Sequence, residues 1–447
     1  MVNDREVAVG YIGGAEQGQF VERIRNAERE RLLAAPIDVG KRSAAALVCD
    51  FWGEIVTTPF EFDLNESGFT KLRAELARAE ACRDVALTRV GVEQAGHYHD
   101  TLVARLQDEG LDVVVLSPSQ VKENRSQNLL RSVKTDARDL AAMAELMIRG
   151  LGRRPELEDG PIARQAILVA HRRRKVRARS ALKNQVLATW DLVFPGLDGC
   201  FGDILSTKIG RVLLAEAMTP VRVLQMGPER FRTFCANRGV VVDRSKADLV
   251  VEAARQAFHL PNVRTQALLE VLQVDARLMR QLDSTIDRAE DCLAEVLNNT
   301  PAKVLVSIPH IGVVRASNYG GAVGDINRFA SSAQIYRMSG LVPRLYESAG
   351  KRRGGLGISR AGKVELREAI LELGKGLRLG HPDFGDYARR MKQRGKPGGV
   401  ILCALGHRAN RLAFAMMRDQ VEFDPARWPA READGTLMPD QGRPPSK

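Results

Sequence analysis

A chain of 447 residues, 44% hydrophobic but only 5% aromatic, can form two or three domains with cores built mainly from Leu, Val, Ile and Ala. Its net charge of +12 favours a polyanionic partner, nucleic acid before an acidic membrane surface. There is no apolar run near the roughly 18 residues of a membrane span, no secretory segment over 1–31, and no paired spacing among six cysteines. We therefore expect a cytoplasmic protein without a membrane partner.

The first third of the chain predicts alternating strands and helices. Residues 1–34 are expected to be an extension, with a charged helix over 16–33 and no assigned function. The order that follows predicts an α/β domain over 35–150 with a ribonuclease-H-like sheet, in which an antiparallel three-strand meander continues into parallel strands covered by helices. The expected strands are 36–40, 44–51, 53–60, 85–92 and 111–116, and the expected helices are 66–82, 97–109 and 136–148.

The predicted order of strands and helices would bring four carboxylates close together. Asp38 ends the first strand and Glu93 ends the fourth, and these two strands would be neighbours. Asp136 and Asp139 open the last helix and share one face. Taken singly, each of these residues is more simply explained as an ordinary acidic residue of a turn, a loop or the first turn of a helix. Together they favour a site for two Mg²⁺ ions bridged by a phosphate, because converging carboxylates need cations.

Cations surround the acidic helix and dominate the next one. Arg125, Lys134 and Arg138 are expected to hold a nucleic-acid backbone beside the metals. After a linker over 151–160, a long helix over 161–193 carries a dense cationic run with almost no acid to pair with it. Because neighbouring cations in such a run repel one another, we expect them to contact phosphates rather than only solvent. The run comprises Arg172, Arg173, Arg174, Lys175, Arg177 and Arg179.

The remainder is predicted to be mostly helical. Residues 200–260 contain short helices without an assigned role. From Leu268 to Val296 a heptad-like seam predicts a helix that packs against 161–193, within the chain or across a dimer, or else an ordinary core helix. Residues 305–312 resemble the phosphate-binding turn of helix–hairpin–helix modules. Beyond residue 423 we expect a disordered tail.

A basic, glycine-bearing loop over 340–355 contains one serine at its centre. A serine in a loop is nearly always a turn or cap residue. The cations beside Ser348 are nevertheless what a phosphoryl-transfer nucleophile needs. Three of them follow it closely and are expected to contact nucleic acid: Lys351, Arg352 and Arg353.

Several short motifs stand out between residues 35 and 418. They are Ile37-Asp38-Val39-Gly40-Lys41, Gly91-Val92-Glu93-Gln94-Ala95-Gly96-His97-Tyr98, Ser117-Pro118-Ser119-Gln120-Val121-Lys122, Lys134-Thr135-Asp136-Ala137-Arg138-Asp139, Ile308-Pro309-His310-Ile311-Gly312, Gly340-Leu341-Val342-Pro343 and the Ser348 loop. In this order they resemble the DEDD transposases of the insertion-sequence 110 family.

The resemblance implies an RNA-guided DNA recombinase that moves its own element. A RuvC-like domain would carry the four acids, a coiled-coil region over 151–300 would mediate assembly, and a transposase domain would span 301–420, followed by the tail 421–447. A structured bridge RNA would pair with donor and target DNA. Ser348 would attack a DNA phosphate, and the acidic site of a partner subunit in a dimer or tetramer would complete the active centre. Ser339 and Ser359 are the alternative nucleophiles.

Three other functions fit parts of the sequence. A metal-dependent nuclease or Holliday-junction-type resolvase would use the four acids and no serine. A non-catalytic nucleic-acid scaffold would keep the fold and lose the chemistry, which the presence of all four acids opposes. An actin-like ATPase could use Asp38-Val39-Gly40 as a phosphate loop, but further glycine-rich loops at suitable distances are missing.

Overall fold

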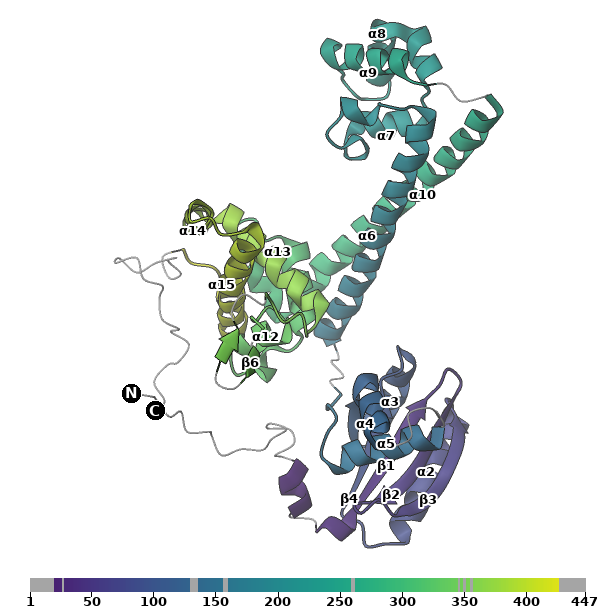
Figure 1. Cartoon of the computed structure of the whole chain (residues 1–447), viewed down its shortest axis with the longest axis vertical. Helices are drawn as coiled ribbons and strands as arrows, with labels where there is room; N and C mark the ends of the chain where they lie inside the picture. Colours follow the sequence, from purple (N-terminus) through teal and green to yellow (C-terminus); the bar gives the residue numbers. More distant parts are fainter. Residues whose placement is uncertain are drawn as a thin grey trace. The chain divides into compact units, whose positions relative to one another are not determined.

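The computed structural model (Figure 1) divides the chain into two compact units, Met1–Leu157 and Glu158–Lys447. Among the described residues, no helix is long and apolar enough to cross a membrane. The expected tail lies outside the described residues from 426 onward, as do most of 1–34 and Lys134. The described residues are 20–25, 28–128, 136–155, 160–258, 262–344, 346–348, 351–353 and 357–425.

The first unit is built on a five-stranded sheet with the order β3-β2-β1-β4-β5. β1, β2 and β3 form an antiparallel meander, and β4 and β5 continue it in parallel with β1. The mixed sheet expected from the order of apolar runs is therefore confirmed. The strands are β1 (Leu32–Val39), β2 (Ser43–Asp50), β3 (Ile55–Asp63), β4 (Leu87–Glu93) and β5 (Asp112–Leu116).

Helices cover both faces of this sheet, and each face has its own apolar core. The strand residues of one face, such as Ile37 and Val92, pack with residues of α2 and α3. Those of the other face, such as Ala34 and Leu116, pack with residues of α4 and α5. The helices are α2 (Glu66–Ala81), α3 (Tyr98–Asp108), α4 (Pro118–Asn128) and α5 (Asp136–Ile148).

Part of the N-terminal extension belongs to the packing of this first unit. Residues 20–25 are helical, and Phe20 is buried with Leu32 at the start of β1. The guanidinium of Arg89 lies 3.9 Å from the centre of the Phe20 ring, and Arg23 pairs with Asp112 at 2.8 Å. The expectation that the domain begins near residue 35 therefore misses a segment that is fastened to the sheet.

The second unit contains two long helices that pack along each other, α6 (Gly160–Val193) and α10 (Asn262–Leu297) (Figure 1). The predicted apolar seam of α10 is largely buried, at Leu272, Met279 and Leu293 among others. The expected packing against the 161–193 helix therefore occurs within the chain. Between the two helices the chain forms the expected short helices, α7 (Lys208–Ala215), α8 (Pro220–Ala236) and α9 (Arg244–Gln256).

The rest of the second unit is mostly helical, as predicted, and has a core of its own. At its centre the hydroxyl of buried Tyr319 donates to Asn410 Oδ1 at 3.0 Å, and Asn410 Nδ2 donates to the Ser332 carbonyl at 2.8 Å. Burial raises the pKa of Tyr319, so the phenol stays a neutral donor. The elements are η4 (Pro301–Ser307), α11 (Val313–Val323), η5 (Ile326–Arg328), α12 (Ser332–Met338), β6 (Tyr346–Ser348), β7 (Lys351–Arg353), α13 (Val364–Gly380), α14 (Pro382–Gln393) and α15 (Gly398–Asp419).

The closeness of α5 to the sheet can be tested at Gly91. A Cβ atom there would lie 2.2 Å from the sulfur of Met147 on α5. We expect Gly91→Ala to lower the free energy of unfolding by about 1–3 kcal/mol through overpacking, and Met147→Ala to lower it by about 2–5 kcal/mol through a cavity. The double variant should lose less than the sum, because the added methyl fills part of the cavity. Additive losses in denaturant unfolding would contradict this packing.

Candidate active site

Asp38, the penultimate residue of β1, and Glu93, the last residue of β4, lie at the same edge of the sheet. Ile37 pairs with Val92, so the next residue of each strand, Asp38 and Glu93, lies beside the other. The cross-strand partner of Asp38 is Ala45 and that of Glu93 is Leu116. Cross-strand partners share a face, and both of these partners pack with the α5 core. The two half-buried carboxylates are therefore on the face that α5 covers.

The other two acids occupy the first turn of α5. Asp136 is exposed, whereas Asp139 is buried with 3% of its surface accessible. Arg125 on α4 forms an ion pair with the Asp139 carboxylate. α4 is also held to α5 by Asn124, whose side-chain nitrogen donates to the Ala142 carbonyl at 3.1 Å. Arg125, expected to contact a nucleic-acid backbone, forms an ion pair with one of the predicted metal ligands.

The four carboxylates are chemically suited to bind a hard cation. Carboxylate oxygens are the ligands that Mg²⁺ prefers, and a buried carboxylate such as Asp139 needs a positive partner. Among the described residues, however, no three His, Cys, Asp or Glu side chains are close enough to hold a metal ion. The structure thus places Asp38 and Glu93 at one edge of the sheet, on the face that α5 covers, and a guanidinium beside Asp139 of that helix.

Half of the basic run on α6 is engaged within the chain. Arg172 pairs with Glu290 of α10 at 2.7 Å, and Arg179 pairs with Asp283. Arg173 pairs with Glu365 and Glu368. The interpretation that this run lacks acids to pair with is wrong, because its partners come from sequence positions over a hundred residues away.

The carboxylate of Glu365 is affected by its pairing with Arg173. Burial acts to raise the pKa of Glu365, but its own backbone N–H and the charge of Arg173 outweigh burial and hold the pKa below the usual value. Arg174 and Arg177 are different. Both are exposed, and in the described part of the structure neither forms an ion pair. The half-exposed Lys175 likewise has no ionic partner there. These three cations remain available for phosphate.

Ser348 lies in a short hairpin rather than in an irregular loop. It is the last residue of β6 and pairs with Lys351 of β7, while Glu347 and Tyr346 pair with Arg352 and Arg353. Below the hairpin, the Arg344 N–H donates to the Gly357 carbonyl at 2.9 Å and the Ser359 N–H donates to the Val342 carbonyl at 2.8 Å. The backbone thus places Ser348 opposite Lys351, and the two hydrogen bonds hold the segments that flank the hairpin together.

The two alternative serines have structural roles. Ser339 is fully buried, and its hydroxyl donates to the Tyr336 carbonyl at 2.7 Å and accepts the Leu341 N–H at 3.3 Å. The Ser359 hydroxyl accepts the Ala361 N–H at 3.1 Å. A buried hydroxyl with both partners in place is poorly suited to attack DNA, which favours Ser348 over Ser339.

The sequence interpretation missed one helix that shapes the site. α4 begins at Pro118, shortly after the strand expected over 111–116, where no helix was predicted. Proline is common at the first position of a helix and serine just before it, so the signal was present. α4 supplies both Arg125 and part of a pocket described below.

Comparisons with known proteins match both units. A model of the DEDD transposases of IS110 matches residues 35–195, and one described as "Transposase IS116/IS110/IS902 family" matches residues 302–384. The chain belongs to the IS110 family of transposases. It is therefore an enzyme that acts on DNA, and the resemblance drawn from the motifs is confirmed.

Two relatives of this transposase match most of its length, and a third matches a shorter part. It is 24% identical over 408 residues to the insertion element IS116 uncharacterized 44.8 kDa protein of Streptomyces clavuligerus, covering 87% of this chain and 96% of the relative. It is 26% identical over 370 residues to the transposase for insertion sequence element IS1111A of Coxiella burnetii, covering 80% of each. The pilin gene-inverting protein of Moraxella bovis is 30% identical over 145 residues, 32% of this chain and 44% of that one.

The two classes of α6 cation predict different mutant behaviour. Arg174→Ala with Arg177→Ala should weaken binding of the transposase to duplex DNA and to structured RNA, and should lower the log–log salt slope by roughly one unit for each phosphate that is no longer bound. Arg172→Ala with Arg179→Ala is the matched pair. It should lower the melting temperature, because it removes the ion pairs to α10, and change the slope less. Equal slopes in wild type and the Arg174/Arg177 variant would contradict the assignment.

Proposed function

We propose that this transposase cleaves and rejoins DNA strands at a centre formed by Asp38, Glu93, Asp136 and Asp139 together with Ser348. One observation carries most of the proposal. The parallel pairing of β1 with β4 puts Asp38 and Glu93 at one edge, on the face against which α5 packs. Carboxylates on adjacent elements of one sheet edge are a suitable set for phosphoryl transfer with divalent ions.

In this proposal the acids hold two Mg²⁺ ions, which when bound would supply charge neutralisation at the phosphate. Asp38 and Glu93 act from rigid strand ends, which fixes their carboxylates relative to each other. Asp139 is already buried and ion-paired with Arg125, so its carboxylate is held in place. The exposed Asp136 lies one turn earlier, on the side of the helix start.

Ser348 is proposed as the nucleophile. Its hydroxyl oxygen would form a bond to a DNA phosphorus while the bond from that phosphorus to a sugar oxygen breaks. The serine proton is lost to a base, and the departing sugar oxygen gains one. A sugar hydroxyl of a second strand would reverse the exchange and release the serine. The basic residues paired across the hairpin, Lys351 to Arg353, would attract the phosphodiester.

Two partners complete the proposal. The exposed cations Arg174 and Arg177 of α6 are proposed to hold a structured guide RNA or the donor and target DNA through phosphate contacts, which carry no sequence information themselves. A second copy of the chain is proposed to contribute its acidic site to the serine of the first. Base pairing by the RNA would then supply the sequence specificity that such contacts lack.

A covalent adduct tests the serine and the second copy together. We expect wild type to form a protein–DNA adduct that survives denaturation, and Ser348→Ala, unlike its control Ser359→Ala, to form none. Asp139→Asn should also form none. Mixing Ser348→Ala with Asp139→Asn should restore the adduct, since each copy supplies what the other lacks. The adduct is measured by denaturing electrophoresis of labelled DNA carrying the element's ends.

Strand cutting without an adduct would contradict the serine mechanism and favour the nuclease. An adduct in wild type that mixing does not restore would mean that the serine and the acids act within one copy.

Metal binding at Asp139 predicts a specific effect on stability. Arg125→Ala removes a guanidinium from a buried carboxylate, so we expect a lower melting temperature. Mn²⁺ should raise the melting temperature of this variant more than that of wild type, because the cation replaces the missing charge. The control, Arg125→Ala with Asp139→Asn, should show no such gain. An equal effect of Mn²⁺ on all three proteins would contradict a metal site at Asp139.

A further inference from the structure

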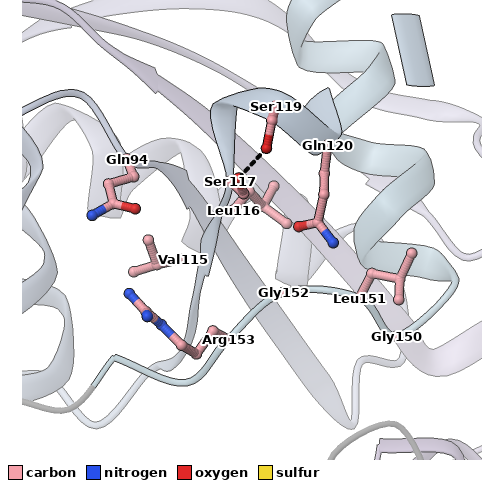
Figure 2. A pocket seen from close by; sticks show the side chains of 10 residues that line it. All are labelled: Gln94, Val115, Leu116, Ser117, Ser119, Gln120, Gly150, Leu151, Gly152 and Arg153. Atoms are coloured by element: carbon pink, nitrogen blue, oxygen red, sulfur yellow. Dashed lines mark hydrogen bonds between the residues drawn. The ribbon is translucent and has the colours of Figure 1, made fainter. Parts of the chain in front are cut away.

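A pocket of about 650 Å³ opens beside the ends of β4 and β5 in the first unit. Gln94, which directly follows Glu93, is one of its walls. In the view of Figure 2, Gln94 and Arg153 lie on one side, and Gln120 and Leu151 lie on the other. The pocket has no role in the site described above, although it adjoins it through Gln94.

The walls of the pocket are held by backbone contacts rather than by the side chains that line it. The Gln94 N–H donates to the Leu116 carbonyl at 3.0 Å. Arg153 pairs with Val115, with N–H to carbonyl distances of 2.7 and 2.9 Å in the two directions. Gly152 has a φ of +117°, and a Cβ atom there would lie 3.0 Å from Val114. Glycine thus lets this segment lie close against β5.

The chemistry of the lining suits a nucleotide. Two carboxamides, Gln94 and Gln120, offer donors and acceptors that can match the edge of a base. The guanidinium of Arg153 suits a phosphate, while Leu116 and Leu151 offer apolar surface. No acidic residue is among the described residues that line the pocket. The volume is within the range of small-molecule sites.

A hydroxyl pair adds a further donor. The Ser117 and Ser119 hydroxyl oxygens are 2.7 Å apart, a separation shown as a dashed line in Figure 2. One hydroxyl donates to the other, so the hydrogen of the accepting hydroxyl can donate to an acceptor in the pocket. These serines belong to the Ser117-to-Lys122 motif, for which neither the metal site nor the nucleophile gives a reason.

We propose that this pocket binds one nucleotide of a nucleic-acid strand, with Arg153 on a phosphate and the Gln94 and Gln120 amides on the base. The inference rests on the proposed function, because it places this nucleotide next to the phosphate handled at Glu93. In open α/β sheets, ligands bind beyond the carboxyl ends of the strands, and Gln94 and Ser117 come directly after β4 and β5. The nucleotide would fix the register of the strand.

Photocrosslinking of the full chain without divalent ions tests binding separately from catalysis. The probes are a single-stranded DNA containing 4-thiothymidine and the free 4-thiothymidine 5′-monophosphate. We expect the strand to label the peptide that carries Gln120 or that contains Arg153. Arg153→Ala and Gln120→Ala should reduce this labelling roughly tenfold, as expected for loss of a hydrogen bond to a charged group or of two amide hydrogen bonds.

Arg154→Ala is the matched control, since Arg154 is the next residue, is exposed and does not line the pocket. The Arg154→Ala protein should be labelled by the strand as strongly as wild type is. Labelling only at other peptides, or equal losses in Arg153→Ala and Arg154→Ala, would overturn the proposal. If the free nucleotide labels the same peptide as efficiently as the strand, the pocket takes a mononucleotide, and its role in the strand is overturned. None of these outcomes depends on adduct formation at Ser348.

Discussion

The ladder between β1 and β4 is the constraint on which the candidate centre depends. In a parallel pair the two strands end at the same edge, so a carboxylate at the end of each is brought beside the other without any loop. Because side chains alternate between faces, shifting the register by one residue would turn one of the two acids to the opposite face of the sheet. The register from Leu32–Leu87 to Ile37–Val92 therefore determines that Asp38 and Glu93 both face α5. The Met147 side chain, which leaves no room for a Cβ atom at Gly91, sets how closely the last turn of α5 approaches β4.

Charge in this protein is balanced over long sequence distances. Arg125 neutralises Asp139 from the preceding helix, and the α6 run pairs with acids of α10 and α13. Some of the cations that contribute to the net charge of +12 are therefore paired within the chain, and others are not. The pairs to α10 join the two long helices, whereas Arg174 and Arg177 are exposed and form no ion pair in the described part of the structure. The pocket beside Glu93 adds one more cation, Arg153, at the edge of the sheet where the acids lie.

Elements with strong periodic patterns were predictable, and those that depend on distant partners were not. The five strands and α5 followed from apolar runs. The start of β1 was misplaced: the strand begins at Leu32, and Pro36, expected to be its first residue, lies inside it. α4 has almost no apolar stripe and was missed. The ion pairs of Arg172 and Arg173 could not be predicted from the neighbouring sequence, since their partners are more than a hundred residues away. The four acids were predicted from the order of the elements, and the shared face of Asp38 and Glu93 came only from the strand register.

The central claim is that Asp38, Glu93 and the start of α5 together hold divalent cations. Anomalous diffraction at the manganese edge, from crystals of the transposase grown with DNA and Mn²⁺, tests it most directly. The account predicts anomalous peaks within bonding distance of Asp38, Glu93 and Asp139, and their loss in Asp139→Asn. Peaks at other residues, or none at these carboxylates in crystals whose DNA has been cut, would contradict it.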